Sequence, residues 1–185
     1  MDSSDDVVAV MSAEQKRILE GFTGLAVHVG SPDHRQFWEL ADRVVRHEVA
    51  AEIVLYPALR DLPGGELLAE GMLHSQTLIQ RQIFSMERAG IGANSFERGR
   101  CDLWSMVHDQ ADRHTAHVLP FLAVALPQGT RTALGRTYEQ VRDTPPHPPV
   151  STTAAGHQAN TIVGRMAALA EWIRDSAGPM LLLVS

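Results

Sequence analysis

Residues 47–60 read His-Glu-Val-Ala-Ala-Glu-Ile-Val-Leu-Tyr-Pro-Ala-Leu-Arg, and their apolar positions recur at spacings of three and four. That spacing is typical of an amphipathic helix. The end of this stretch resembles residues 118–122, Val-Leu-Pro-Phe-Leu, and the two prolines, Pro57 and Pro120, are 63 residues apart. A proline late in a long helix removes a hydrogen bond and bends the helix. Two bends at matched positions predict helix pairs related by a pseudo-two-fold axis, and chance similarity between two amphipathic helices is the alternative.

Four segments of the chain carry the same helical period, and Gly/Pro-rich stretches separate them. They cover residues 6–28, 32–59, 66–88 and 95–125. Four helices of this length with short connections predict an all-α fold, an antiparallel four-helix bundle over residues 1–127. Residues 128–158 are rich in Pro, Gly and Thr and predict an extended arm, followed by a short helix over residues 160–175. We expect this 128–185 region to pack on the bundle, whereas disorder or an oligomer contact are alternatives.

Composition limits the class of protein. The 185 residues suit one domain, and a 44% hydrophobic content can form a buried core. The formal charge of −6 argues against a nucleic-acid-binding face. A single cysteine, Cys101, excludes an internal disulfide, and no apolar run approaches the length of a membrane span. We therefore expect a cytoplasmic monomer or homodimer with no nucleic-acid or membrane partner.

Histidine and acidic side chains lie at helical spacings within three of the four segments. His47 and Glu52 are on the second segment, His74 is on the third, and His114 and His117 share a face of the fourth. Side chains that converge from facing helices form metal centres in bundle cores. Imidazole and carboxylate groups suit iron, manganese or zinc.

These residues carry a resemblance to a known family. Residues 47–60 resemble the H-E-x-A-E-E-x-x-x-Y-P signature of the hemerythrin-like HHE cation-binding domain family, in its actinobacterial form. The resemblance extends over nearly the whole chain, since residues 6–10 look like the start of the family's first helix and the 128–185 region looks like its tail. It implies a four-helix bundle with a non-haem di-iron centre that binds dioxygen, nitric oxide or peroxide, or senses iron or redox state.

The chain departs from the family at several positions that the resemblance assigns to metal ligands. These positions fall on Gln15, Ala51, Gln110 and His114. Bridging carboxylates hold two metal ions about 3.5–4 Å apart and neutralise their charge. Because neither Ala51 nor His114 supplies a carboxylate, the ordinary di-iron centre is not expected here.

Three alternatives remain for the site. A single metal ion would be bound by His47, Glu52, His74 and His114. A rearranged two-metal site would recruit His108, Asp112 or His117. A metal-free cavity would serve another purpose, since glutamine keeps its hydrogen bonding while losing affinity for metal.

We expect first a non-haem metal protein, with one or two iron ions, that binds or reacts with dioxygen, peroxide or nitric oxide. Gln15, Tyr56, Gln110 and His117 would then line the site around the ligands. The second hypothesis is a metal-free descendant that binds a small organic molecule, with His47, Glu52 and His114 as acid–base groups, as in a biosynthetic cyclase. A third is an interaction protein that acts through its proline-rich arm.

Overall fold

The computed structural model describes residues 5–27, 34–89 and 94–144, together with residues 162, 164, 168 and 171. This part of the chain is all-helical and contains no strand. Its helices, in chain order, are α1 (Val7–Val27), α2 (His34–Ala50), η2 (Ala51–Leu55), α3 (Tyr56–Arg60), α4 (Glu66–Ala89), α5 (Asn94–Arg113), η3 (His114–Val118), α6 (Leu119–Ala125) and α7 (Gln128–Asp143).

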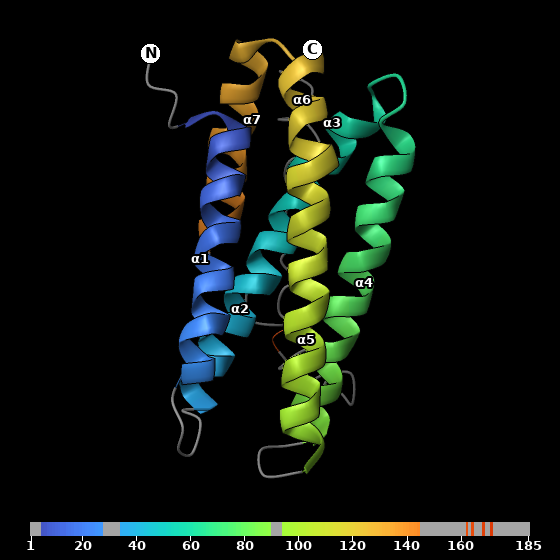
Figure 1. Cartoon of the computed structure of the whole chain (residues 1–185). Helices are drawn as coiled ribbons and strands as arrows, with labels where there is room; N and C mark the ends of the chain where they lie inside the picture. The colour runs from blue at the N-terminus through green and yellow to red at the C-terminus, as the bar shows by residue number, and fades with distance from the viewer. Residues whose placement is uncertain are drawn as a thin grey trace.

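Several of these elements join into longer helices. α2, η2 and α3 continue into one another because the residues at their junctions keep right-handed helical backbone angles, and α5, η3 and α6 do the same. Figure 1 shows the long helices lying side by side along one direction. The four predicted helical segments therefore agree with the structure to within two residues at each described end.

Two π-helical turns, η2 and η3, lie in matched places. Ala51 corresponds to His114 and Leu55 to Val118, so the two turns share the 63-residue offset of the prolines that follow them. A proline has no N–H to donate, and its ring clashes with the carbonyl four residues earlier. Just before each proline the backbone N–H therefore bonds to the carbonyl five residues back, from Tyr56 to Ala51 and from Leu119 to His114. A π-helical distortion is thus present before each of the two matched prolines, and the pseudo-two-fold relation of the helix pairs stays a prediction.

The hydrophobic core follows the helical period. α4 buries Ala69, Met72, Gln76, Ile79 and Ile83, which alternate spacings of three and four along one face. The core continues between α1, α2 and α5 through Phe22, Val44, Leu103 and other apolar side chains. Burial of this continuous apolar surface is the main favourable term in folding.

Helix α7 corrects the prediction of an extended arm from residue 128. It begins after Pro127 and packs against both α1 and α2, behind α1 in the view of Figure 1. Its buried face carries Leu134, Gly135, Tyr138 and Val141, which is again a helical spacing. A Cβ atom on Gly135 would lie 2.0 Å from the backbone oxygen of Asp5, so only glycine permits this close approach to the start of α1.

Polar contacts also hold the start of α1 against its neighbouring helices. Asp6 caps α1 by accepting a hydrogen bond from the backbone N–H of Val8, at 3.0 Å. The second oxygen of this carboxylate pairs with Arg131 of α7 at 2.8 Å. Arg131 also donates to the backbone oxygens of Ala123 and Leu126 at the end of α6. One guanidinium thus joins three helices.

The rest of the predicted arm, including residues 145–149, lies outside the described residues, as does most of the predicted helix over residues 160–175. Within that helix Ile162 is helical and buried, and its backbone N–H donates to Glu87 of α4 at 2.8 Å. Among the helices described, none combines the length and the apolar character that crossing a bilayer requires.

Candidate functional site

Five buried polar side chains from three of the long helices meet inside the core, and we call them the polar core. They are Gln15 from α1, His47 and Glu48 from α2, Gln110 from α5 and His114 from η3, and none is more than 5% exposed. Together with Ile18, Val44 and Val107 they line a small internal cavity of about 10 Å³.

Hydrogen bonds connect the polar core across the helices. The Gln15 side-chain amide lies 2.5 Å from His114 Nδ1, and the Gln110 amide donates to Glu48 Oε2 at 2.9 Å. The two imidazole rings are edge to face, with their centroids 6.0 Å apart. Outside the five, the Tyr138 hydroxyl of α7 lies 2.5 Å from His47 Nδ1. Each imidazole is thereby held in place by a partner from a different helix.

Some buried polar atoms at this site have no hydrogen-bond partner among the described residues. They include Oε1 of Gln15, Nε2 of His114 and the hydroxyl of Tyr56. The first two belong to cavity-lining residues, and the Tyr56 ring lies 6.4 Å from that of His114. A buried polar atom without a partner costs about 1–3 kcal/mol, so this arrangement favours an occupant that hydrogen-bonds to both sides of the cavity.

Burial removes charge from the polar core at neutral pH. Desolvation lowers the pKa of His47 from 6.5 to about 4, helped by the positive charge of Arg142, and lowers the pKa of His114 to about 3. Desolvation also raises the pKa of Glu48 to about 8, against the hydrogen bond from Gln110 and with the charge of Glu52. At pH 7 both imidazoles are therefore neutral, and Glu48 is largely a protonated acid.

This charge state suits proton transfer. A carboxylic acid that is protonated at neutral pH can donate a proton, and a neutral imidazole can accept one. Environments that push neighbouring pKa values apart are how proteins assign acid and base roles at one site. Glu48 and the histidines line the same cavity, so both roles are available to one small molecule.

The structure brings together only part of the predicted ligand set. His47 and His114 meet in the polar core, with Gln15 and Gln110 beside them. His74 and His117 do not join them, because both are exposed on the outer faces of their helices. The structure therefore does not bring these two histidines to the polar core.

Glu52 also lies apart from the cavity. It is half-buried, and Gln76 of α4 donates to its Oε2 at 2.6 Å. The prediction placed Glu52 among the histidines, but in the structure Glu48 is the carboxyl group that lines the cavity with them. Glu52 follows Glu48 by four residues, so it shares a face with Glu48 but lies about one turn farther along the helix.

The donor set does not fit the di-iron centre that the family resemblance implies. Among the described residues no three His, Cys, Asp or Glu side chains form a group that could hold a metal ion. The only carboxyl group lining the cavity is Glu48, and it would bring at most one negative charge to two divalent cations. His108 and Asp112, suggested for a rearranged site, pair with each other at 3.3 Å on the surface of α5.

Sequence reasoning missed two residues that shape this site, Glu48 and Tyr138, and it also missed the inward position of Gln76 on α4. Glu48 stands beside His47 in the quoted motif but was passed over in favour of Glu52. Gln76 continues the apolar spacing of α4, so the period alone could have placed it inward and His74 outward. Tyr138 could have been found only by recognising α7 as a helix.

Comparison with known proteins finds no match to this chain among family models, curated proteins or solved structures.

Proposed function

We propose that the protein is a metal-free, hemerythrin-like antiparallel four-helix bundle whose polar core binds a small organic molecule and carries out acid–base chemistry on it. The four helices of the bundle would be α1, α2–α3, α4 and α5–α6, with α7 added across α1 and α2. The helix contacts are compatible with this arrangement, since α4 packs on α5, and α1 packs on α2 and α5.

One observation carries the proposal: Gln15 and His114 both line the small cavity, and each has a buried polar atom without a hydrogen-bond partner among the described residues. With the Gln15 amide donating to Nδ1 of His114, the imidazole proton sits on Nε2 as a free donor, and Oε1 of Gln15 is a free acceptor. A ligand hydroxyl group satisfies both, because it accepts one hydrogen bond and donates another. A ligand carbonyl would accept from His114 alone.

The remaining residues have defined roles in this proposal. Glu48 is the general acid, and Gln110 orients its carboxyl group through the 2.9 Å hydrogen bond. His114 is the general base once a bound ligand presents a proton to it, and His47 supports it from the facing helix. Tyr138 is a positioning residue, since it contacts His47 and does not line the cavity.

Binding requires the helices to move apart. A cavity of about 10 Å³ holds about one water-sized molecule. An organic ligand therefore enters only when the core opens, and π-helical turns such as η2 and η3 are common places for functional distortion in helices. Because His114 is the first residue of η3, motion there would change its position directly.

Metal binding, which the family resemblance led us to expect first, stays a prediction. It is less well supported than the metal-free function because the described ligand set is incomplete and the cavity carries no net charge at neutral pH.

The test is ligand binding to the full chain in the presence of a chelator. We would titrate phenols, cyclic ketones and lactones into the labelled protein and follow the imidazole nitrogen signals of His47 and His114 by NMR. The proposal expects at least one probe to shift the His114 signals saturably, and this probe should not bind the His114→Phe variant. His117→Phe is the matched control, since that histidine is exposed. If no probe shifts the core histidines, or if binding survives in His114→Phe, the proposal is wrong.

A further inference from the structure

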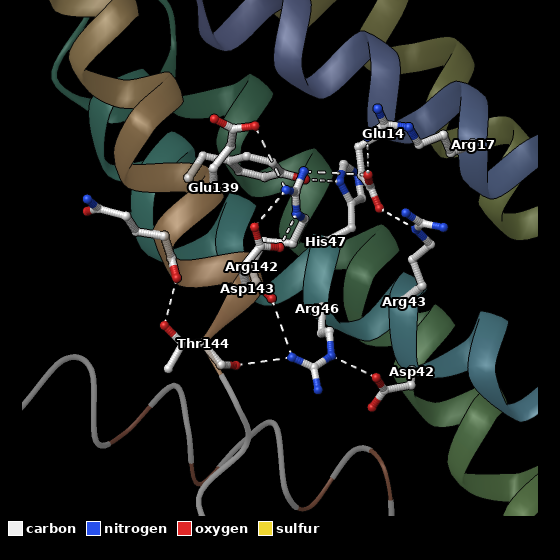
Figure 2. Close-up of polar contacts among 12 residues, drawn as sticks. Glu14, Arg17, Asp42, Arg43, Arg46, His47, Glu139, Arg142, Asp143 and Thr144 are labelled. Atoms are coloured by element: carbon white, nitrogen blue, oxygen red, sulfur yellow. Dashed lines mark hydrogen bonds and ion pairs between the residues drawn. The ribbon is translucent and has the colours of Figure 1, made fainter. Parts of the chain in front are cut away.

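A second hollow lies on the surface formed by α1, α2 and α7, and we call it the arginine cleft. It has a volume of about 480 Å³, and four arginines line it, namely Arg17, Arg43, Arg46 and Arg142. Figure 2 shows the guanidinium groups of Arg17, Arg43 and Arg142 around the carboxylate of Glu14, whereas that of Arg46 reaches Asp42 and the backbone of Thr144. The cleft is within the size range of small-molecule sites.

Glu14 forms the floor of the cleft. Its side chain is only 1% exposed, and three guanidinium groups share its two oxygens. Arg43 Nε lies 2.7 Å from one oxygen, whereas Arg17 and Arg142 lie 3.4 and 3.5 Å from the other. Around this carboxylate the guanidinium groups outnumber the acid three to one, whereas the cleft as a whole is formally balanced because Glu39, Asp42 and Asp143 also line it.

The four arginines differ in how many of their N–H donors already contact other groups of the protein. Arg46 pairs with Asp42 and donates to the backbone oxygen of Thr144, and Arg142 pairs with Asp143 at 2.8 Å. These contacts fix the walls of the cleft.

Arg17 and Arg43 retain hydrogen-bonding capacity. Within the described part of the chain, Arg43 donates only through Nε, and Arg17 makes only its 3.4 Å contact with Glu14. Their side chains are 47% and 57% exposed, for Arg43 and Arg17 respectively. Because a guanidinium group has five N–H donors, both can receive a second anion at the mouth of the cleft.

We propose that the arginine cleft binds the anionic group, a carboxylate or a phosphate, of a small organic molecule through Arg17 and Arg43. The planar guanidinium group matches both anions with paired hydrogen bonds. Glu14 keeps the two side chains in place from below, and the cleft leaves room for the rest of the molecule. This proposal goes beyond the function of the polar core and does not depend on it.

The cleft and the polar core share a wall. Glu14 precedes Gln15 in α1, and Arg46 precedes His47 in α2. On α7, the Arg142 guanidinium group lies 5.8 Å from the centre of the Tyr138 ring, whose hydroxyl contacts His47. Arg142, which lines the cleft, is therefore connected to the buried His47 through the side chain of Tyr138.

The experiment measures anion binding to the full chain by calorimetry at low ionic strength, where exposed charges are least screened. The probes are inorganic phosphate and succinate, in separate titrations, so that the two anionic groups are distinguished. We expect saturable binding of one of them with a dissociation constant below about 1 mM. In Arg17→Gln and in Arg43→Gln the affinity should fall about tenfold or more, because each loses charge-assisted hydrogen bonds.

Arg136→Gln is the matched control, since Arg136 is an exposed arginine that pairs with Asp5 outside the cleft. It should bind the anion as the wild type does. Arg17→Gln is the variant that keeps the fold with most certainty, because Arg17 makes a single long contact, and far-UV circular dichroism checks this. The proposal is overturned if neither probe binds saturably, or if Arg136→Gln loses as much affinity as the two cleft variants. Binding of organic probes to the core histidines is read separately by NMR, so the two proposals fail independently.

Discussion

Replacing Glu48 with glutamine should remove a loss of stability that the wild-type protein shows above pH 6.5. The substitution keeps the shape of the side chain and the oxygen that accepts from Gln110. It removes the one proton that burial holds on this carboxyl group at neutral pH, since the pKa of Glu48 is raised to about 8.

The sign and size of the effect follow from proton linkage. Between pH 4.5 and about 8 the folded chain holds the Glu48 proton and the unfolded chain has released it. Rising pH in this window therefore lowers the free energy of unfolding by about 1.4 kcal/mol per pH unit. His47 and His114 act in the opposite direction, because below pH 6.5 only the unfolded chain binds their protons.

The three groups together place the maximum of their joint contribution near pH 6.5. From pH 6.5 to about 8 only the Glu48 contribution remains, and it amounts to a loss of about 2 kcal/mol. The Glu48→Gln variant has no such proton, so its free energy of unfolding should fall by about 2 kcal/mol less than that of the wild type over this window.

Urea unfolding followed by far-UV circular dichroism at several pH values measures this difference. Using the difference between the two proteins cancels every titration that they share. If the difference stays constant from pH 6.5 to 8, Glu48 is already ionised at the lower pH, as it would be beside a bound cation. That result would refute the neutral polar core.

Three further predictions concern packing and placement. Gly135→Ala should lower the free energy of unfolding by about 1–3 kcal/mol or more, since its Cβ would lie 2.0 Å from a backbone oxygen at the start of α1, whereas Gly129→Ala, with open space around it, should not lower it. Tyr138→Phe should cost about 1–3 kcal/mol in chemical unfolding because it removes the hydroxyl that contacts the buried His47, and an unchanged stability would contradict that contact. His74→Ala should change the free energy of unfolding by less than about 0.5 kcal/mol, because this histidine is exposed. A larger loss would contradict its exposed position.

The sequence was sufficient for the helices whose apolar period is strong, and insufficient for α7. Residues 128–143 contain two glycines and three threonines, and the proline-rich residues that follow suggested an extended arm. The buried face of α7 is short, and much of its stability comes from packing on α1 and α2, which no local pattern reveals.

The site was predicted only in part, again because a local sequence pattern does not reveal the packing between helices. His47 and His114 could be placed from the sequence because their inward position agrees with the helical period. His74 was misplaced because residue type was given more weight than period, whereas Gln76 follows the alternating spacings of α4. Glu48 and Glu52 share a helix face about one turn apart, and the sequence pattern does not decide which of them lies at the depth of the histidines.

The content of bound metal tests the central claim, that the polar core works as a neutral, metal-free site. Iron, manganese and zinc would be measured by mass spectrometry in protein produced with each metal added, beside His47→Ala and His114→Ala. The account predicts well under one metal ion for every two chains in all three proteins, and an unchanged melting temperature of the wild type in a chelator. About one metal ion per chain in the wild type, lost in both variants, would contradict it.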